Sequence, residues 1–315
     1  MKKRIFLFIL ILSLLQLPIR ATGDYIRWVD FNVEYEALKT AMEIDIRSRD
    51  TEKPLSWISL LALAATRSGG GSLSPKAVRD AQKTLLGDTS LKKLLGKQYS
   101  TYAYYEEAYT AVLGGLLGSY AIEIKGQWVP QYGLKAFSPI AAGYAYSHYE
   151  DFGSRRTYGF ARRHLGNDLM GTLGTPIVAV EGGTVEAMGW NQYGGWRMGI
   201  RSSDRKRYYY YAHLQKDHPF AEGLEVGDRV QAGQLIGFMG RTGYSTKENV
   251  NNIDAVHLHF GIQLIFDESQ KECDSEIWID PYHIVKLLST HRSSLQKTDG
   301  KWSRLYPYKD LDLGS

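Results

Sequence analysis

The sequence predicts an α+β protein in which a helical bundle precedes a mainly antiparallel β-sheet domain. Apolar residues recur at three-to-four spacing from residue 31 to about 120, which is the period of a helix buried on one face. From about residue 164 the pattern changes to short apolar segments bounded by Gly, Asp or Asn, as expected for strands joined by turns. The chain also holds 32 glycines and 22 tyrosines, which favours tight turns and aromatic sheet faces.

A chain of 315 residues is long enough for two domains or one large one. The pattern divides it into five parts. We expect a signal peptide or N-terminal anchor over 1–23, a helical domain over 24–120, a connecting segment over 121–155, a β domain over 156–290 and a C-terminal tail over 291–315.

Residues 1–23 have the layout of a secretory signal. Lys2, Lys3 and Arg4 precede the apolar run IFLFILILSLLQLPI, and small residues follow it. The run is short for a membrane span of about 20 residues, but the small residues do not form a clean cleavage site. An uncleaved membrane anchor through residues 5–19 is therefore the alternative to a cleaved signal.

Cysteine usage and charge narrow the protein class. Cys273 is the single cysteine, so no intramolecular disulfide can form, and an exported protein of this kind fits a bacterial cell envelope. The net charge of +4 is mild. It suits a polyanionic cell wall, but it is too weak and too dispersed to indicate binding to nucleic acid.

Four helices are predicted in the first part of the chain. The first lies in FNVEYEALKTAMEIDI (31–46), with Asn32 as its cap, and a buried helix follows in EKPLSWISLLALAATRS, which stops at three glycines. Ser74 as N-cap and Pro75 in the first turn mark the third helix, and YEEAYTAVLGGLLGSYAIE (105–123) predicts the fourth. Nothing in these helices indicates chemistry.

The second part of the chain predicts a compact antiparallel sandwich or a partly rolled sheet. The strand candidates are TPIVAVEGGTVEAM, GGWRMGIRS, KRYYYYAHL, DRVQAGQLIGFMG and VHLHFGIQLI. The segment WIDPYHIVKLLSTH predicts a closing helix, and a polar tail follows it.

Two histidines stand two positions apart in the strand VHLHFGIQL. Residues two apart share one face of a strand, so His257 and His259 point away from the apolar side chains between them, and Gly261 leaves open space on their face. Two imidazoles above a gap are suited to a site. The alternative is a half-exposed strand with solvated histidines.

A second motif, H-x-x-x-D, supplies His164 and Asp168. Helical spacing would present both side chains on one face, but Gly166 and Asn167 favour a turn. Nitrogen and oxygen ligands without a thiolate suit a catalytic zinc, which keeps an open position for water. The alternative is a surface His–Asp pair that caps a turn.

A third motif, YYYYAHLQ, places His213 at the end of a tyrosine-rich strand. Alternation puts His213 on the face of Tyr209 and Tyr211. Such a histidine can orient water or stabilise an oxyanion beside the HLH pair, or it can simply be exposed at a strand end. The other histidines lack such partners and are expected to be ordinary: His148, His218, His283 and His291.

Taken together and in order, these motifs resemble the lysostaphin-type zinc endopeptidases. The series is H-x-x-x-D, GTPIVAVEGGTVE, YAHL, V-x-x-G-Q-x-IG-x-x-G-x-TG-x-S and HLHF, with DPY after the last strand. It covers about residues 155–285 and leaves out the helical region. The resemblance implies a lysostaphin-type, duplicated-hybrid-motif-like β domain with one Zn²⁺ per chain. It implies an enzyme that hydrolyses peptide bonds in the stem or cross-bridge of bacterial peptidoglycan.

The resemblance also implies roles for five residues. The expected zinc ligands are His164, Asp168 and His259. The expected catalytic histidines are His213 and His257, and which of the two acts as the base stays open.

Some features leave alternatives open. The insertions KENVNNIDAV and FDESQKECDSEIW are expected near the site, and residues 121–160 could cover it in a latent form. A non-catalytic envelope protein of the same fold, which binds peptidoglycan or regulates another hydrolase, is the main alternative, although the ligand set is complete. GLEVGDRVQAGQLIGFMG also resembles a lipoyl carrier hairpin, but Met188 and Gly189 stand where such a carrier needs its lysine.

Overall fold

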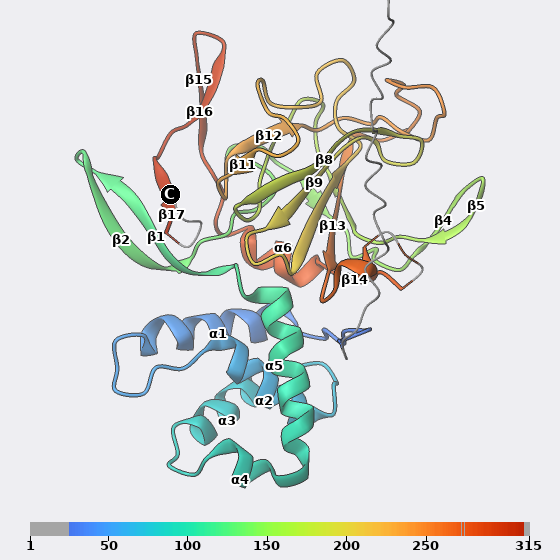
Figure 1. Cartoon of the computed structure of the whole chain (residues 1–315). Coiled ribbons are helices and arrows are strands. Elements are labelled where there is room, and N and C mark those ends of the chain that lie inside the picture. The colour runs from blue at the N-terminus through green and yellow to red at the C-terminus, as the bar shows by residue number, and fades with distance from the viewer. Residues whose placement is uncertain (1–24, 272, 274, 312–315) are drawn as a thin grey trace, which may run out of the picture.

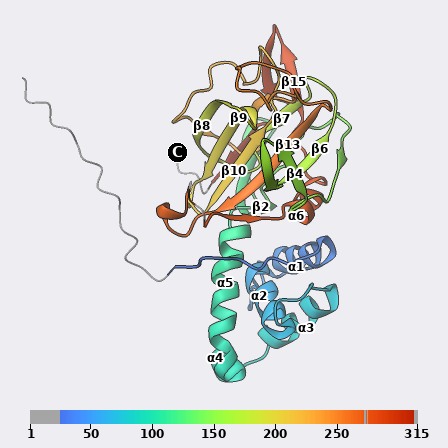
Figure 2. The same cartoon turned by 90° about the vertical axis from the view of Figure 1, so that its right-hand side faces the viewer.

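The computed structural model describes residues 25–271, 273 and 275–311 (Figure 1). A group of helices lies on one side of a larger β region, and α5 leads from one into the other (Figures 1 and 2). The predicted fold class is confirmed. The expected signal or anchor at 1–23 lies outside the described residues. Within the described part of the chain, no helix has the length and apolar character that a membrane span requires.

The helical unit follows the apolar spacing of the sequence. Its elements are α1 (Tyr35–Ser48), α2 (Trp57–Ser68), α3 (Pro75–Leu85), α4 (Leu91–Leu95), a 3₁₀ turn (Gly96–Gln98) and α5 (Tyr99–Leu113). The Ser56 side chain caps α2, which ends at Gly69 in the left-handed conformation. Ser74 caps α3 beside Pro75, as the sequence predicts.

Two predictions about these helices are wrong. Asn32 does not cap α1; its side chain donates instead to the backbone oxygen of Gly70, which ties the chain before α1 to the end of α2. The last helix begins at Tyr99 and ends at Leu113 rather than running to residue 123. Gly115 follows this end, and a Cβ there would lie 1.7 Å from a carboxylate oxygen of Glu181 in the β region.

A small sheet joins the connecting segment to the C-terminal segment. β1 (Leu117–Ile124) pairs with β2 (Gln127–Leu134) on one side and with β17 (Tyr308–Asp310) on the other. β15 (Leu295–Thr298) and β16 (Lys301–Arg304) form a further hairpin. The described part of the segment predicted as a polar tail, residues 291–311, therefore contains three strands. A buried ion pair links β17 to the residue after β2, with Lys135 Nζ 3.0 Å from Asp310 Oδ1.

The main sheet is antiparallel, with the strand order β11-β8-β9-β10-β13-β6-β3 and β14 beside β13. The bounds are β3 (Ser147–His148), β6 (Asn167–Met170), β8 (Gly183–Asn191), β9 (Gly195–Ser202), β10 (Arg207–Ala212), β11 (Arg229–Val230), β13 (His257–Leu264) and β14 (Ile277–Ile279). Shorter elements surround it: β4 (Arg155–Tyr158) with β5 (Phe160–Arg163), β7 (Pro176–Val178) with β12 (Leu235–Phe238), the 3₁₀ turn Glu268–Gln270 and the closing helix α6 (Tyr282–Leu288).

The two faces of the main sheet differ sharply. One face is the core, where side chains from β9, β10 and β13 are at most 1% exposed: Met198, Ile200, Tyr209, Tyr211, Leu258, Phe260 and Ile262. The opposite face carries polar and aromatic groups. Strand alternation therefore holds these groups in fixed positions above a rigid, close-packed base.

A buried polar network docks the helical unit onto the sheet. Arg207 Nη1 donates to the backbone oxygen of Ala111 at the end of α5, over 2.7 Å. Arg207 Nε also donates to Glu181 Oε2 over 2.8 Å, and Tyr209 Oη donates to the same oxygen. Cation and carboxylate are almost fully buried, so this pair ties the two regions together.

Candidate metal centre

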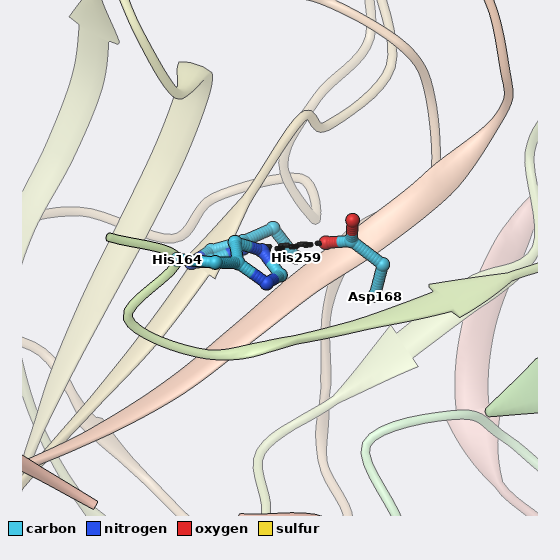
Figure 3. A group of neighbouring side chains, drawn as sticks. All are labelled: His164, Asp168 and His259. Carbon is cyan, nitrogen blue, oxygen red and sulfur yellow. Dashed lines mark hydrogen bonds and ion pairs between the residues drawn. The ribbon is translucent and has the colours of Figure 1, made fainter. Parts of the chain in front are cut away.

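Three side chains from separate strand segments converge on the polar face of the sheet (Figure 3). His259 on β13 and Asp168 on β6 are register partners, and His164 follows β5. His164 Nε2 lies 2.7 Å from His259 Nδ1 and 3.0 Å from Asp168 Oδ1, and the last two atoms are 3.4 Å apart. The chain turns between His164 and Asp168 and enters β6, as Gly166 and Asn167 predict.

Gly166 makes this convergence sterically allowed. A Cβ at this position would lie 2.4 Å from the backbone oxygen of Phe260 and 2.9 Å from the imidazole of His259. Any side chain would therefore push the segment away from β13 and separate His164 from His259. The glycine serves close approach here, since its backbone needs no left-handed conformation.

The three donors suit a zinc ion by type and by spacing. Two imidazole nitrogens and one carboxylate oxygen form the donor set of catalytic zinc sites, and tetrahedral zinc separates its ligand atoms by roughly 3.3 Å. The charges agree. Although burial alone would raise it, hydrogen bonds from His164 and His259 hold the pKa of Asp168 far below its usual range. Burial opposes charge on His164, but its bonds to Asp151 and Asp168 outweigh burial and raise its pKa to about 9. The cluster thus attracts positive charge.

Asp151 and Arg156 hold the cluster from behind, and sequence reasoning missed both. His164 Nδ1 lies 3.1 Å from the backbone oxygen of Asp151 and 3.3 Å from its carboxylate, so it donates to Asp151 and leaves Nε2 for the cluster. Asp151 Oδ1 accepts from the backbone N–H of Asp168 over 3.2 Å, and Arg156 Nη2 donates to Asp168 Oδ2 over 3.0 Å. Such outer partners fix the tautomer and direction of a ligand.

His213 and His257 stand beside the cluster, with ring centroids 4.7 Å apart. His213 Nδ1 donates to the backbone oxygen of Thr242 and His257 Nδ1 to that of Ala255, each over 2.9 Å, because a carbonyl can only accept. In the neutral form of each ring this leaves the lone pair on Nε2, and His257 Nε2 lies 3.7 Å from Asp168 Oδ1. Burial lowers the pKa of His213 well below its usual value, and the neighbouring His257 and His259 lower it further. A neutral His213 is available to accept a proton.

The prediction that His213 shares a strand face with Tyr209 and Tyr211 is wrong. Tyr209 and Tyr211 are buried in the core, whereas Tyr210 and Ala212 line the same cavity as His213. His213 follows the last residue of β10 and has a φ of 62°, in the left-handed region. This conformation breaks the strand alternation and turns the imidazole to the metal side. Strain of this kind is held by surrounding contacts and gathers at functional sites.

A groove of about 430 Å³ runs over the cluster and both histidines. Arg162 comes from the β4–β5 hairpin, Tyr193 from the β8–β9 turn, and Trp278 from the predicted insertion at 266–278. The space expected beside Gly261 is not open: a Cβ there would lie 2.8 Å from the Trp278 ring. Among the described residues, the insertion at 247–256 supplies no lining residue of the groove, but the backbone oxygen of its Ala255 accepts the hydrogen bond from His257.

The remaining histidines lie outside this groove. His148 bonds Asn167, His291 stacks on Phe137, His218 stacks on Phe238, and His283 lies on α6. The segment 121–160 was a candidate to cover the cluster. Among its described side chains, Arg156 is the one that lines the groove, and it is an ion-pair partner of Asp168. The described part of that segment therefore leaves the cluster facing the groove.

The comparisons with known proteins point to one family. Residues 162–273 match peptidase family M23. L-Ala–D-Glu endopeptidase of Bacillus subtilis is 37% identical over 124 residues, which are 39% of this chain and 36% of that protein. Lysostaphin of Staphylococcus simulans is 40% identical over 98 residues, 31% of this chain and 17% of that protein. The chain thus spans about a third or less of these relatives' lengths.

One solved structure extends the likeness beyond the β region. The lytM structure from Ruminococcus gnavus superposes with a TM-score of 0.54 and 25% sequence identity, over 84% of this chain and 91% of that chain. The superposition covers 84% of this chain, which is far more than residues 162–273, the part that matches peptidase family M23. Part of the region outside residues 162–273 therefore has a counterpart in that structure.

Proposed function

We propose that this chain, which contains a peptidase family M23 domain, is a zinc-dependent endopeptidase that hydrolyses peptide bonds in bacterial cell-wall peptidoglycan. The observation that carries the proposal is the convergence of three ligand atoms within 3.4 Å of one another. The relatives' names supply the substrate: they are endopeptidases of L-Ala–D-Glu and glycyl-glycine bonds and of peptidoglycan.

His164 Nε2, Asp168 Oδ1 and His259 Nδ1 are the proposed zinc ligands. Bound there, zinc supplies a Lewis acid that polarises the scissile carbonyl and acidifies water. Three protein ligands would leave zinc able to take up water or substrate, and all three residues line the groove. Asp151 and Arg156 keep the ligands aimed at one point, so the site needs little reorganisation when it is filled.

His213 and His257 are the proposed catalytic residues. Each has its Nδ1–H bound to a backbone oxygen, so each Nε2 can take a proton from the attacking water or, once protonated, hydrogen-bond the substrate oxygen as it gains charge. Their rings are 4.7 Å apart, which lets the two act on one substrate peptide bond. The assignment of base and oxyanion partner between them is left open.

Peptidoglycan lies outside the cytoplasm, so we further propose that the chain acts in the bacterial cell envelope or outside the cell. Residues 1–23 are the proposed export signal, with an uncleaved anchor through 5–19 as the alternative. Edman sequencing of the mature protein distinguishes these: a new N-terminus after residue 20 supports cleavage, and an intact start supports an anchor.

Zinc content and wall digestion measured together test the enzymatic proposal. His259→Ala should lose both bound zinc and the release of peptides from purified cell walls. His213→Gln should keep the zinc and lose the release, because His213 is not a ligand. A fully zinc-loaded wild-type protein that is inert on walls of several species would favour a non-catalytic, wall-binding role.

A further inference from the structure

We propose that the groove takes a peptide with a free carboxylate next to the scissile bond, and that Arg162 and Arg197 bind this carboxylate. The inference rests on the proposed function, because it names the substrate class of the same site. It separates the stem peptide, which carries such carboxylates, from a glycine bridge, which carries none within its chain.

The charges along the groove are the first observation. Five cationic side chains line it: Arg156, Arg162, Arg163, Arg197 and Lys271. Arg156 is paired with Asp168, and Lys271 with Glu186 over 2.7 Å. The other three arginines have no ion pair within the described part of the chain. Besides the ligand Asp168, Glu276 is the single acidic residue among the described lining residues, so the groove holds an excess of positive charge.

Unsatisfied donors are the second observation. Arg162 Nη1, Arg197 Nε and Gln263 Nε2 are shielded from solvent and have no hydrogen-bond partner among the described residues. All three lie in residues that line the groove, and Gln263 is only 3% exposed. Buried donors are nearly always paired in folded proteins. These three donors are therefore available to a ligand that brings oxygen atoms into the groove.

The third observation is where these guanidinium groups lie. The Arg162 guanidinium packs over the rings of Tyr193 and Tyr244, at 5.0 and 5.2 Å from their centroids. The ring centroid of Tyr244 in turn lies 6.1 Å from that of His213. One aromatic ring thus separates Arg162 from a proposed catalytic histidine. Two tyrosines hold the guanidinium in place, which limits the side-chain entropy lost on binding.

Arg197 lines the same groove from β9, together with Arg162 and Tyr210. The Tyr210 ring lies 5.8 Å from the imidazole of His259. Two arginines from different elements therefore line the groove that holds the metal cluster.

A carboxylate satisfies this arrangement better than a neutral peptide. Arginine forms two parallel hydrogen bonds with a carboxylate, and charge-assisted bonds are about twice as strong as neutral ones. A site built around such bonds discriminates strongly against an analogue that lacks the group, because its own buried donors stay unpaired. A glycine peptide offers carbonyl oxygens but no charge to oppose three arginines.

The test uses zinc-loaded full-length protein and three synthetic peptides. The first contains an L-Ala–D-Glu bond and a free remaining glutamate carboxyl. The second is the same peptide with that carboxyl amidated, and the third is pentaglycine. We expect kcat/KM to be about tenfold to hundredfold higher for the acid than for its amide, the range of one charge-assisted bond.

Variants then assign the effect. Arg162→Met and Arg197→Met should each shrink the acid-to-amide ratio of kcat/KM, while zinc content stays that of the wild type. Arg162→Lys keeps the charge and the ring contacts, so it should retain more of the ratio than Arg162→Met. Arg155→Met removes an exposed arginine from the same hairpin and should leave the ratio unchanged.

The outcomes separate the two proposals. Equal cleavage of acid and amide, a preference for pentaglycine, or arginine variants that lower both rates alike would overturn the carboxylate proposal and leave the endopeptidase intact. No cleavage of any peptide by zinc-loaded protein would overturn both.

Discussion

Asp151→Asn tests whether the carboxylate behind His164 sets the metal affinity of the cluster. Asn has the shape of Asp but lacks its charge, and its amide group can face the His164 Nδ1–H with a second donor. The backbone oxygen of Asp151, 3.1 Å from His164 Nδ1, stays in place, so the imidazole keeps its tautomer. The substitution removes the negative charge of the carboxylate that lies 3.3 Å from His164 Nδ1. The same negative charge forms an ion pair with Arg156, which is also lost.

The expected size follows from these contacts. Loss of one outer partner of a metal-bound histidine typically weakens metal binding about 10- to 100-fold, which is about 1.4–2.8 kcal/mol. Because one of the two acceptors of His164 survives, we expect the lower half of this range. Asp168 is then the remaining described carboxylate paired with Arg156, and the guanidinium draws charge from that ligand, which acts in the same direction.

Zinc affinity is measured by competition with a chelating dye, so that the readout does not depend on turnover. Glu150→Gln is the matched control, since it removes one negative charge at the neighbouring, exposed position. We expect the control to change the zinc Kd less than threefold, the size of a weak surface effect. Wild-type affinity in Asp151→Asn, or an equal loss in both variants, would refute a positioning role for Asp151.

Three further outcomes follow from the described contacts. Gly166→Ala should lose zinc binding, because its Cβ would lie 2.4 Å from a backbone oxygen of β13; Gly71→Ala, whose Cβ has no neighbour nearer than 3.5 Å, should bind normally in the same dye assay. Arg207→Met should lower the free energy of unfolding by about 3–5 kcal/mol, because it leaves the buried carboxylate of Glu181 without its cation. The control Arg205→Met removes an exposed cation and should lower the free energy of unfolding by under about 1 kcal/mol. Urea denaturation measures both values, and equal losses would contradict the docking role of Arg207. Burial lowers the pKa of His148 to about 4, below its unfolded value of 6.5, so its contribution to stability is present above pH 6.5 and is lost as the pH falls towards 4. Urea denaturation at pH 7 and pH 4.5 should therefore show a smaller acid loss in His148→Gln than in the wild type, and identical losses would contradict this.

The sequence predicts the parts of this fold that depend on local pattern. The helices α2 and α3 have apolar periodicity, serine caps and a proline or glycine at the expected end, so their position follows from residues close in the chain. The end of α5 was predictable in this way only in part. Gly114 and Gly115 at this end are a local stop signal, which the predicted helix ran through. What local pattern does not carry is that Gly115 lies against Glu181, a contact across 66 positions of the sequence.

The site residues likewise fall into those that local sequence pattern predicts and those that it does not. His164, Asp168, His257 and His259 are recognisable because their residue types and spacing are unusual in apolar strands. Asp151 belongs to no spacing pattern, since it reaches His164 through the fold of the β4–β5 hairpin.

The turn of His213 was also hidden, because strict strand alternation assigns it to the wrong face. Its left-handed φ comes from tertiary contacts: the backbone N–H of His213 donates to Gly194, and its imidazole donates to Thr242. A histidine directly after a tyrosine-rich strand was a sufficient signal for a site residue, but not for its direction.

The proposed zinc ligands and the proposed carboxylate-binding Arg162 lie on different kinds of element. Two of the three proposed zinc ligands lie on neighbouring strands of the main sheet, with Asp168 directly opposite His259 in the register. Strands above a close-packed core hold ligand atoms to within fractions of an ångström, which metal binding requires. Arg162, by contrast, lies on a two-stranded hairpin outside that sheet. Arg156 on the same hairpin donates to Asp168, but Arg162 has no contact with a proposed ligand among the described residues. Substitution of Arg162 can therefore change substrate preference while the metal cluster stays intact, which is why the acid-to-amide ratio and the zinc content are expected to vary independently.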